Sequence, residues 1–275
     1  MSRRLFPVLS IIALIVSSLA CSLPGNSVSS AAPAPTDSSA VTSSPSDSAT
    51  ATEPPAPAVS ESGSGACANP FYPIAVGVSW SYSFSGAAPG NFTRSIIAVN
   101  ADGFTDQDAF DNGVTRTGDW KCDAGALIAL QPDGGQSGTS NVESSNVSVS
   151  FQTTEMSGVT MPATLNPGET WTQNFILEGI ETINGQEIPA KNETAHSCTV
   201  GNTESVTVPA GTFDAVHVDC TTDMKITITL NGSEVPTAIT STSTVWYASG
   251  VGMIKTDSQV NGATSVIELT AYTIP

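Results

Sequence analysis

Apolar and polar side chains alternate along most of the chain after residue 66, with the two-residue period of a half-buried β-strand. The clearest case is residues 78–85, where Trp80, Tyr82 and Phe84 alternate with serines. The same period recurs, among other places, in residues 95–99, 115–122, 147–151, 171–177, 226–230 and 267–271. This pattern predicts strands with one buried face and one solvated face.

The connections between these runs are short and contain Gly or Asn, as in Asp111-Asn112-Gly113 and Asn231-Gly232. Such connections join antiparallel neighbours, and no stretch longer than about ten residues has helical spacing. We therefore predict an all-β unit of about twelve strands in a single curved antiparallel sheet, forming a half-barrel or barrel with short helical turns at most. The alternative is a β-sandwich. Residues 69–74, an apolar segment bounded by prolines, are expected to cover the sheet edge.

The N-terminus predicts a signal peptide over residues 1–20. Arg3 and Arg4 precede an apolar run from Leu5 to Ala20, which would rise about 24 Å as a helix and is short for a bilayer core of about 30 Å. Ser18-Leu19-Ala20-Cys21 resembles the lipobox of bacterial lipoproteins, although the usual Leu is replaced by Ser18. The resemblance implies lipidation of Cys21. The alternatives are an ordinary cut that leaves a free thiol and, for the route, a twin-arginine signal instead of a general one.

Residues 21–65 consist almost entirely of Ser, Thr, Ala and Pro. This composition offers little apolar surface to offset the entropy of folding, so it predicts a disordered tether. The folded domain is expected over residues 66–275, long enough for one sizeable core.

The charge balance narrows the range of partners. The chain has 8 Lys+Arg against 25 Asp+Glu, giving a formal net charge of −17. Nucleic acid and anionic membrane surfaces would repel such a protein. We therefore exclude nucleic-acid binding and expect a soluble domain held at the envelope by its lipid anchor.

Two windows in the domain resemble a known signature. Val206–Phe213 reads VTVPAGTF, in which Pro209 and Gly211 suit the turn of a β-hairpin with a three-residue loop, and Trp246–Lys255 reads WYASGVGMIK. Together they resemble a signature of exported bacterial proteins of unknown function, including TapB-like proteins, a group distantly similar to lipoproteins of the LolA type. The resemblance implies a curved β-sheet and leaves the function open.

Four cysteines remain when Cys21 is set aside, an even number that predicts disulfides in an exported chain. Cys198 and Cys220 flank the hairpin and are expected to pair, which leaves Cys67 for Cys122. The first pair requires a strand irregularity at Gly201-Asn202. A metal site is the competing interpretation, but the sequence has no C-x-x-C or H-x-x-x-H spacing, so no metal or cofactor is expected.

The four tryptophans are candidates for a ligand pocket. Trp80, Trp120, Trp171 and Trp246 could line a hollow for an apolar or sugar ligand, because the LolA resemblance implies binding of acyl chains on a concave sheet. The alternative is that these side chains belong to the core.

Catalytic residues are scarce. Only His196 and His217 are available as bases, and His217 lies two positions from Asp219, so a Ser-His-Asp or small metal arrangement is conceivable. The alternative is two structural histidines, and neither G-x-S-x-G nor H-E-x-x-H occurs.

The acidic segment 102–113 is interpreted as a hairpin with acidic edges, with a Ca²⁺ loop as the alternative.

The sequence thus predicts a non-enzymatic, exported lipoprotein, anchored through Cys21 at the cell membrane or outer surface, whose curved sheet binds an apolar ligand or an envelope protein. A purely structural or adhesive module is the alternative, and a hydrolase has the least support. A cavity on the order of several hundred Å³ would favour a ligand, and a filled interior would argue against one.

Overall fold

The computed structural model describes residues 65–86, 89–113, 115–130, 141–143, 147–183, 185–230 and 232–275. The chain divides into two compact units, residues 1–58 and 59–275, and every described residue belongs to the second. The predicted signal peptide, Cys21 and residues 22–64 of the tether lie outside the described residues. Within the described ranges, no helix is long and apolar enough to cross a membrane.

The described residues form an all-β unit, as the alternation predicts. One turn of 3-10 helix precedes the strands. The elements are η1 (Gly65–Cys67), β1 (Ser79–Gly86), β2 (Gly90–Val99), β3 (Gly103–Phe110), β4 (Thr115–Asp123), β5 (Ala126–Ala129), β6 (Asn141–Glu143), β7 (Val147–Gly158), β8 (Thr170–Ile183), β9 (Gln186–Val208), β10 (Gly211–Leu230), β11 (Ser233–Ala248), β12 (Gly252–Val260) and β13 (Ala263–Thr273).

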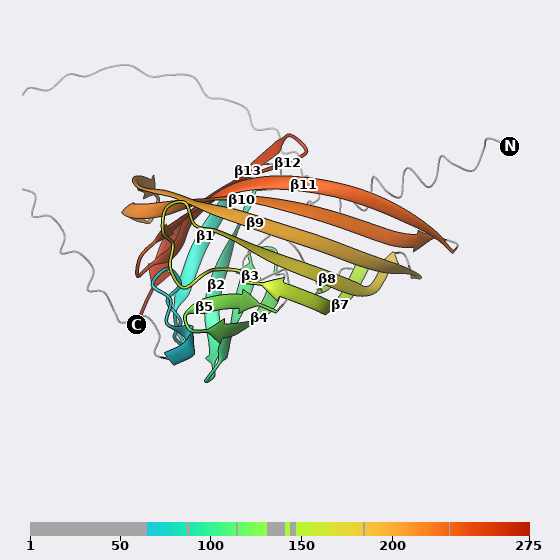
Figure 1. Cartoon of the computed structure of the whole chain (residues 1–275), viewed down its shortest axis with the longest axis horizontal. Coiled ribbons are helices and arrows are strands. Elements are labelled where there is room, and N and C mark those ends of the chain that lie inside the picture. Colours follow the sequence, from blue (N-terminus) through green and yellow to red (C-terminus); the bar gives the residue numbers. More distant parts are fainter. Residues whose placement is uncertain are drawn as a thin grey trace, which may run out of the picture. The chain divides into compact units, whose positions relative to one another are not determined.

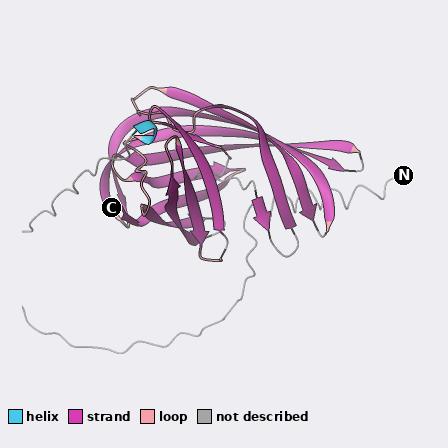
Figure 2. Cartoon of the chain, turned by 90° about the horizontal axis from the view of Figure 1, so that it is seen from below, coloured by secondary structure: helices cyan, strands magenta, loops and turns pink. Residues whose placement is uncertain are grey.

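All strands belong to one antiparallel sheet in the order β5-β4-β3-β2-β1-β13-β12-β11-β10-β9-β8-β7-β6. Neighbours in the sheet are neighbours in the sequence, except where β1 pairs with β13 and joins the two ends of the meander. The sheet bends strongly (Figure 2). The single curved sheet is thus confirmed, and the alternative of a β-sandwich is not.

The sheet nearly closes into a barrel where the segment before β8 meets β5. Leu127 of β5 forms an isolated bridge with Met161, and its N–H donates to the Met161 carbonyl at 2.8 Å. The Thr153 hydroxyl of β7 also donates to the carbonyl of Leu130 at 2.9 Å. These contacts join the two arms of the sheet, the one that ends in β5 and the one that contains β7 and the segment after it. The apolar face of the sheet is thereby enclosed.

Three strands are longer than the others. β9, β10 and β11 have 23, 20 and 16 residues, whereas the longest of the remaining strands, β8, has 14. In Figure 1, β9, β10 and β11 run well past the short strands as one curved ribbon. The described part of the chain is therefore a nearly closed barrel with an extended sheet.

The hairpin of the signature joins β9 to β10. Val208 pairs with Gly211, so the loop has two residues, Pro209 and Ala210, and not the predicted three. Gly211 has a φ of 142°, a conformation that favours glycine. Farther along, Gly201 and Asn202 lie opposite the single residue His217, which is a β-bulge at the position predicted from the cysteine register.

The structure contains the Cys67–Cys122 and Cys198–Cys220 disulfides, the same two pairs that the sequence predicts. The first ties η1 to β4. The second joins directly opposite residues of β9 and β10, because the bulge brings them into register. Both pairs are buried next to apolar side chains.

Candidate functional site

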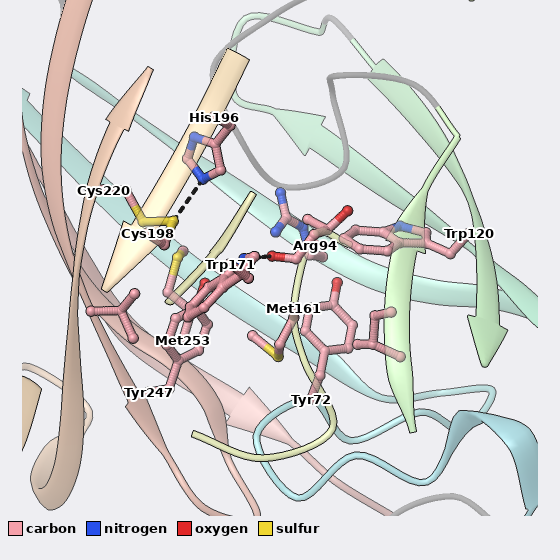
Figure 3. Close-up of a pocket in the computed structure, with 13 residues that line it drawn as sticks. Tyr72, Arg94, Trp120, Met161, Trp171, His196, Cys198, Cys220, Tyr247 and Met253 are labelled. Atoms are coloured by element: carbon pink, nitrogen blue, oxygen red, sulfur yellow. Dashed lines mark hydrogen bonds between the residues drawn. A yellow bond between two sulfur atoms is a disulfide. The ribbon is translucent and has the colours of Figure 1, made fainter. Parts of the chain in front are cut away.

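A small cavity lies inside the sheet, between the main core and the apolar cluster around the second disulfide. Its volume is about 30 Å³, enough for one or two water molecules. Figure 3 shows side chains from both arms of the sheet converging on it. The lining residues are Tyr72, Arg94, Trp120, Leu127, Thr160, Met161, Trp171, His196, Cys198, Val218, Cys220, Tyr247 and Met253.

One wall of the cavity combines the second disulfide with a histidine. Alternation along β9 places His196 and Cys198 on the same face, and Cys220 and Thr222 lie directly opposite on β10. His196 Nε2 is 3.0 Å from Cys198 Sγ, and Nδ1 is 2.8 Å from the Thr222 hydroxyl. Burial lowers the pKa of His196, which favours the neutral imidazole.

A buried ion pair lies at the other wall. Arg94 of β2 donates from Nε and Nη2 to the two carboxylate oxygens of Asp108, each at 2.7 Å. Asp106 lies 3.8 Å from Arg94 and accepts a hydrogen bond from the Tyr72 hydroxyl at 3.0 Å. Burial raises the pKa of Asp106, and the neighbouring guanidinium offsets this only in part. All three charged side chains are buried.

The expectation that segment 102–113 has acidic edges is therefore wrong for its central residues. Asp106 and Asp108 point inward to Arg94, because they alternate with outward residues along β3. Asp111 accepts a hydrogen bond from the Asn91 backbone N–H at 3.0 Å. This segment brings carboxylates to an internal cation and not to a Ca²⁺ loop.

The four tryptophans do not gather around one pocket. Trp120 and Trp171 line the cavity. Trp80 is 1% exposed, and its indole N–H donates to the Val251 carbonyl at 2.6 Å, as expected for a core residue. Trp246 is half-buried and donates to Glu204, which is exposed. The predicted pocket lined by four tryptophans is therefore not formed.

The two histidines lie on opposite faces of the sheet, so they do not belong to one site. His217 shares a face with Asp219, whereas Val218 and Cys220 face the cavity with His196. The His217 ring nitrogens are 3.8 Å from Glu204 and 3.9 Å from Asp219. These distances exceed those of hydrogen bonds, and they do not form a catalytic triad.

Among the described residues, one set of side chains could hold a metal ion. The ligand atoms of His196, Cys198 and Cys220 all lie within 4.8 Å of one another, with the two sulfurs joined in the disulfide. Sequence spacing did not reveal this set, because its members lie on two different strands.

Arg94 was also missed by the sequence analysis. A charged residue in the alternating apolar run from Phe92 to Ile96 indicates an internal partner.

Comparison with known proteins gives one family and two solved structures. A family model described as DUF3108-like matches residues 122–265, and comparison with curated proteins finds no match. A candidate exported protein with a YmcC-like fold from Bacteroides fragilis is 16% identical, with a TM-score of 0.45, over 74% of this chain and 99% of its own. A candidate lipoprotein from Parabacteroides distasonis is 16% identical, with a TM-score of 0.48, over the same shares of the two chains.

Proposed function

The chain belongs to the DUF3108-like family, and we propose that it is a lipid-anchored protein of the bacterial envelope that binds a protein partner and catalyses no reaction. Export is supported by Arg3 and Arg4, by the apolar run to Ala20 and by the two disulfides, which are typical of oxidising compartments. With four cysteines paired, Cys21 is left for the lipid. The predicted tether of residues 21–65 would hold the β unit away from the membrane.

The small cavity formed by the described residues inside the sheet is the observation on which the choice of partner rests. Pockets for small molecules usually have about 300–1,000 Å³, whereas the cavity inside this sheet has about 30 Å³. An acyl chain of the kind bound by LolA-type carriers does not fit such a volume. We infer that a partner binds on the surface of the sheet, which favours a protein over an enclosed apolar ligand.

A solvent-facing group of side chains, which we name the Trp246 cluster, supplies a suitable surface. Its members are Trp246, Glu204, His217, Asp219 and Lys255. The Lys255 ammonium lies 4.9 Å from the centre of the Trp246 ring. Tryptophan is enriched among the residues that contribute most of the binding energy at protein interfaces. Because the whole chain is strongly acidic, we expect the partner to present a basic surface.

The lipid anchor is tested by following the chain in cells with a labelled fatty acid. We expect the label on the wild-type chain and its loss in Cys21→Ser, together with release of the protein from the membrane fraction. A Cys21→Ser chain that keeps the label would contradict the anchor.

Surface binding is tested with a photo-crosslinking residue at position 199, which lies opposite Asp219, and with a control at the exposed Thr117 of β4. We expect one discrete adduct from position 199 and none from position 117. Trp246→Ala and added salt should both weaken the adduct.

Solvent extraction of the purified protein tests the alternative that it carries a lipid. One mole of bound lipid per mole of chain would overturn the surface-binding proposal.

A further inference from the structure

The wall of the cavity that contains the second disulfide has the composition of a metal site. Cys198 and His196 are two residues apart on one face of β9, and Cys220 is directly opposite Cys198 on β10. Two sulfurs and one imidazole nitrogen thus point to the same place, with all three atoms within 4.8 Å of one another. Figure 3 shows the imidazole directed at the sulfur of Cys198.

Nε2 of His196 lies 3.0 Å from Sγ of Cys198, slightly closer than two ligand atoms of one zinc ion. Tetrahedral Zn²⁺ with bonds of about 2.3 Å to sulfur and about 2.0 Å to nitrogen holds its ligand atoms roughly 3.5–3.8 Å apart. Once the S–S bond is broken, small side-chain rotations would bring the sulfurs to this separation. The strands need not move, because both cysteines already project from directly opposite positions.

The surroundings also suit a metal ligand. The Thr222 hydroxyl lies 2.8 Å from Nδ1 of His196, and this contact orients the ring with Nε2 toward the sulfur. A second partner of this kind is usual for histidines that bind metals. The cavity borders all three side chains and has about 30 Å³ of space, room for the water that fills the fourth position of zinc sites with three protein ligands.

We propose that Cys198, Cys220 and His196 form a binding site for Zn²⁺ when the disulfide between the two cysteines is reduced. A dithiol reductant breaks the S–S bond, supplies two electrons and two protons, and closes into its own disulfide. Zn²⁺ then binds both sulfurs as thiolates and Nε2 of His196, and the two thiol protons pass to water. The first disulfide has a different role, because Cys67–Cys122 fastens η1 to β4 and the only other histidine of the chain, His217, lies beside Glu204 and Asp219.

The test uses the full chain with Cys21→Ser, reduced with a phosphine, which does not compete as a thiol ligand. Co²⁺ serves as the spectroscopic probe and Zn²⁺ as its competitor. We expect thiolate-to-cobalt charge-transfer bands that saturate at one equivalent, appear only after reduction and disappear when Zn²⁺ is added. The double variant Cys198→Ser/Cys220→Ser should lack these bands after reduction. The parent chain should also lack them while it is oxidised.

The two histidines provide a matched pair of variants. His196→Ala should weaken Co²⁺ binding by at least about tenfold, since it removes a ligand, and His217→Ala, on the opposite face, should leave binding unchanged. The proposal is overturned if the reduced, folded chain shows no bands, or if His196→Ala binds as tightly as the parent. Should reduction alone unfold the chain, Zn²⁺ must restore its far-ultraviolet circular dichroism, and failure to do so also overturns the proposal.

Discussion

The buried pair between Arg94 and Asp108 is a strong constraint at the scale of single residues. Removing one partner from a buried ion pair leaves an uncompensated charge and costs about 3–5 kcal/mol. We therefore expect Arg94→Met to lower the free energy of unfolding by that amount, measured with urea. Lys225→Met, which removes an exposed pair with Glu193, is the control and should change stability little. A similar small effect of Arg94→Met would contradict the role of the pair.

Glu181 gives a prediction about pH. Burial raises the pKa of this carboxyl, which is 9% exposed on the inner face of β8. A raised folded-state pKa means that its contribution to stability is complete below the unfolded pKa of about 4.3 and is lost as pH rises through the folded value. Glu181→Gln cannot ionise, so its stability relative to wild type should increase between about pH 4 and pH 7.

Urea unfolding of both chains across that pH range measures the Glu181 effect, because the other titrating groups cancel in the difference. Glu178→Gln, at an exposed position of the same strand, is the matched control. A difference between Glu181→Gln and wild type that stays constant with pH would show that Glu181 does not titrate as we infer.

The sequence indicated some of these residues and not others. Arg94 was missed, although it alternates with the apolar Phe92 and Ile96. Its partner depends on the strand register, which sets it opposite Asp108. The sequence singled out His196 as a possible base and Cys198 as a disulfide partner. Their place at the cavity depends on side chains from distant strands. Pairing across strands is a tertiary property that spacing within one strand does not reveal.

At the scale of elements, the bulge in β9 explains why the second disulfide forms. The sequence located this irregularity at Gly201-Asn202 because the hairpin and the cysteines disagreed in register. It did not reveal why glycine is needed there. A Cβ at position 201 would lie 1.7 Å from Nε2 of His217, so the imidazole packs directly over the glycine.

Because of this contact, we expect the effects of substitutions at Gly201 and His217 on stability to depend on each other. Gly201→Ala should destabilise the fold by about 1 kcal/mol, the low end for overpacking, because the atoms in the way are the end of the His217 side chain. His217→Ala alone should have a small effect. The double variant should recover most of the loss, because the smaller side chain removes the clash. Urea unfolding of the four chains measures the coupling energy. Additive effects would mean that the strain at position 201 does not arise from His217.

At the scale of the whole molecule, the sequence predicted one curved antiparallel sheet but not how far it closes. Alternation and turn residues specify strands and their neighbours, whereas closure depends on the bridge between Leu127 and Met161, two residues that are far apart in the sequence. The small interior follows from this closure and from the large side chains that fill it, Trp80 and Phe104 among them. The way side chains from distant strands fill the interior is therefore not visible in strand patterns.

Asn69 links the segments on either side of the bridge, so we expect it to stabilise the closed sheet. Its side chain is fully buried, donates to the carbonyls of Gly125 at 2.8 Å and Pro162 at 3.0 Å, and accepts from the Phe71 N–H at 2.9 Å. Asn69→Ala leaves these groups without that partner and should cost about 3 kcal/mol. It should also speed hydrogen exchange of the amides at the bridge, whereas Asn166→Ala, at an exposed site, should not. Unchanged exchange at the bridge in Asn69→Ala would mean that the sheet closes without this side chain, and that apolar contacts alone hold the two arms together.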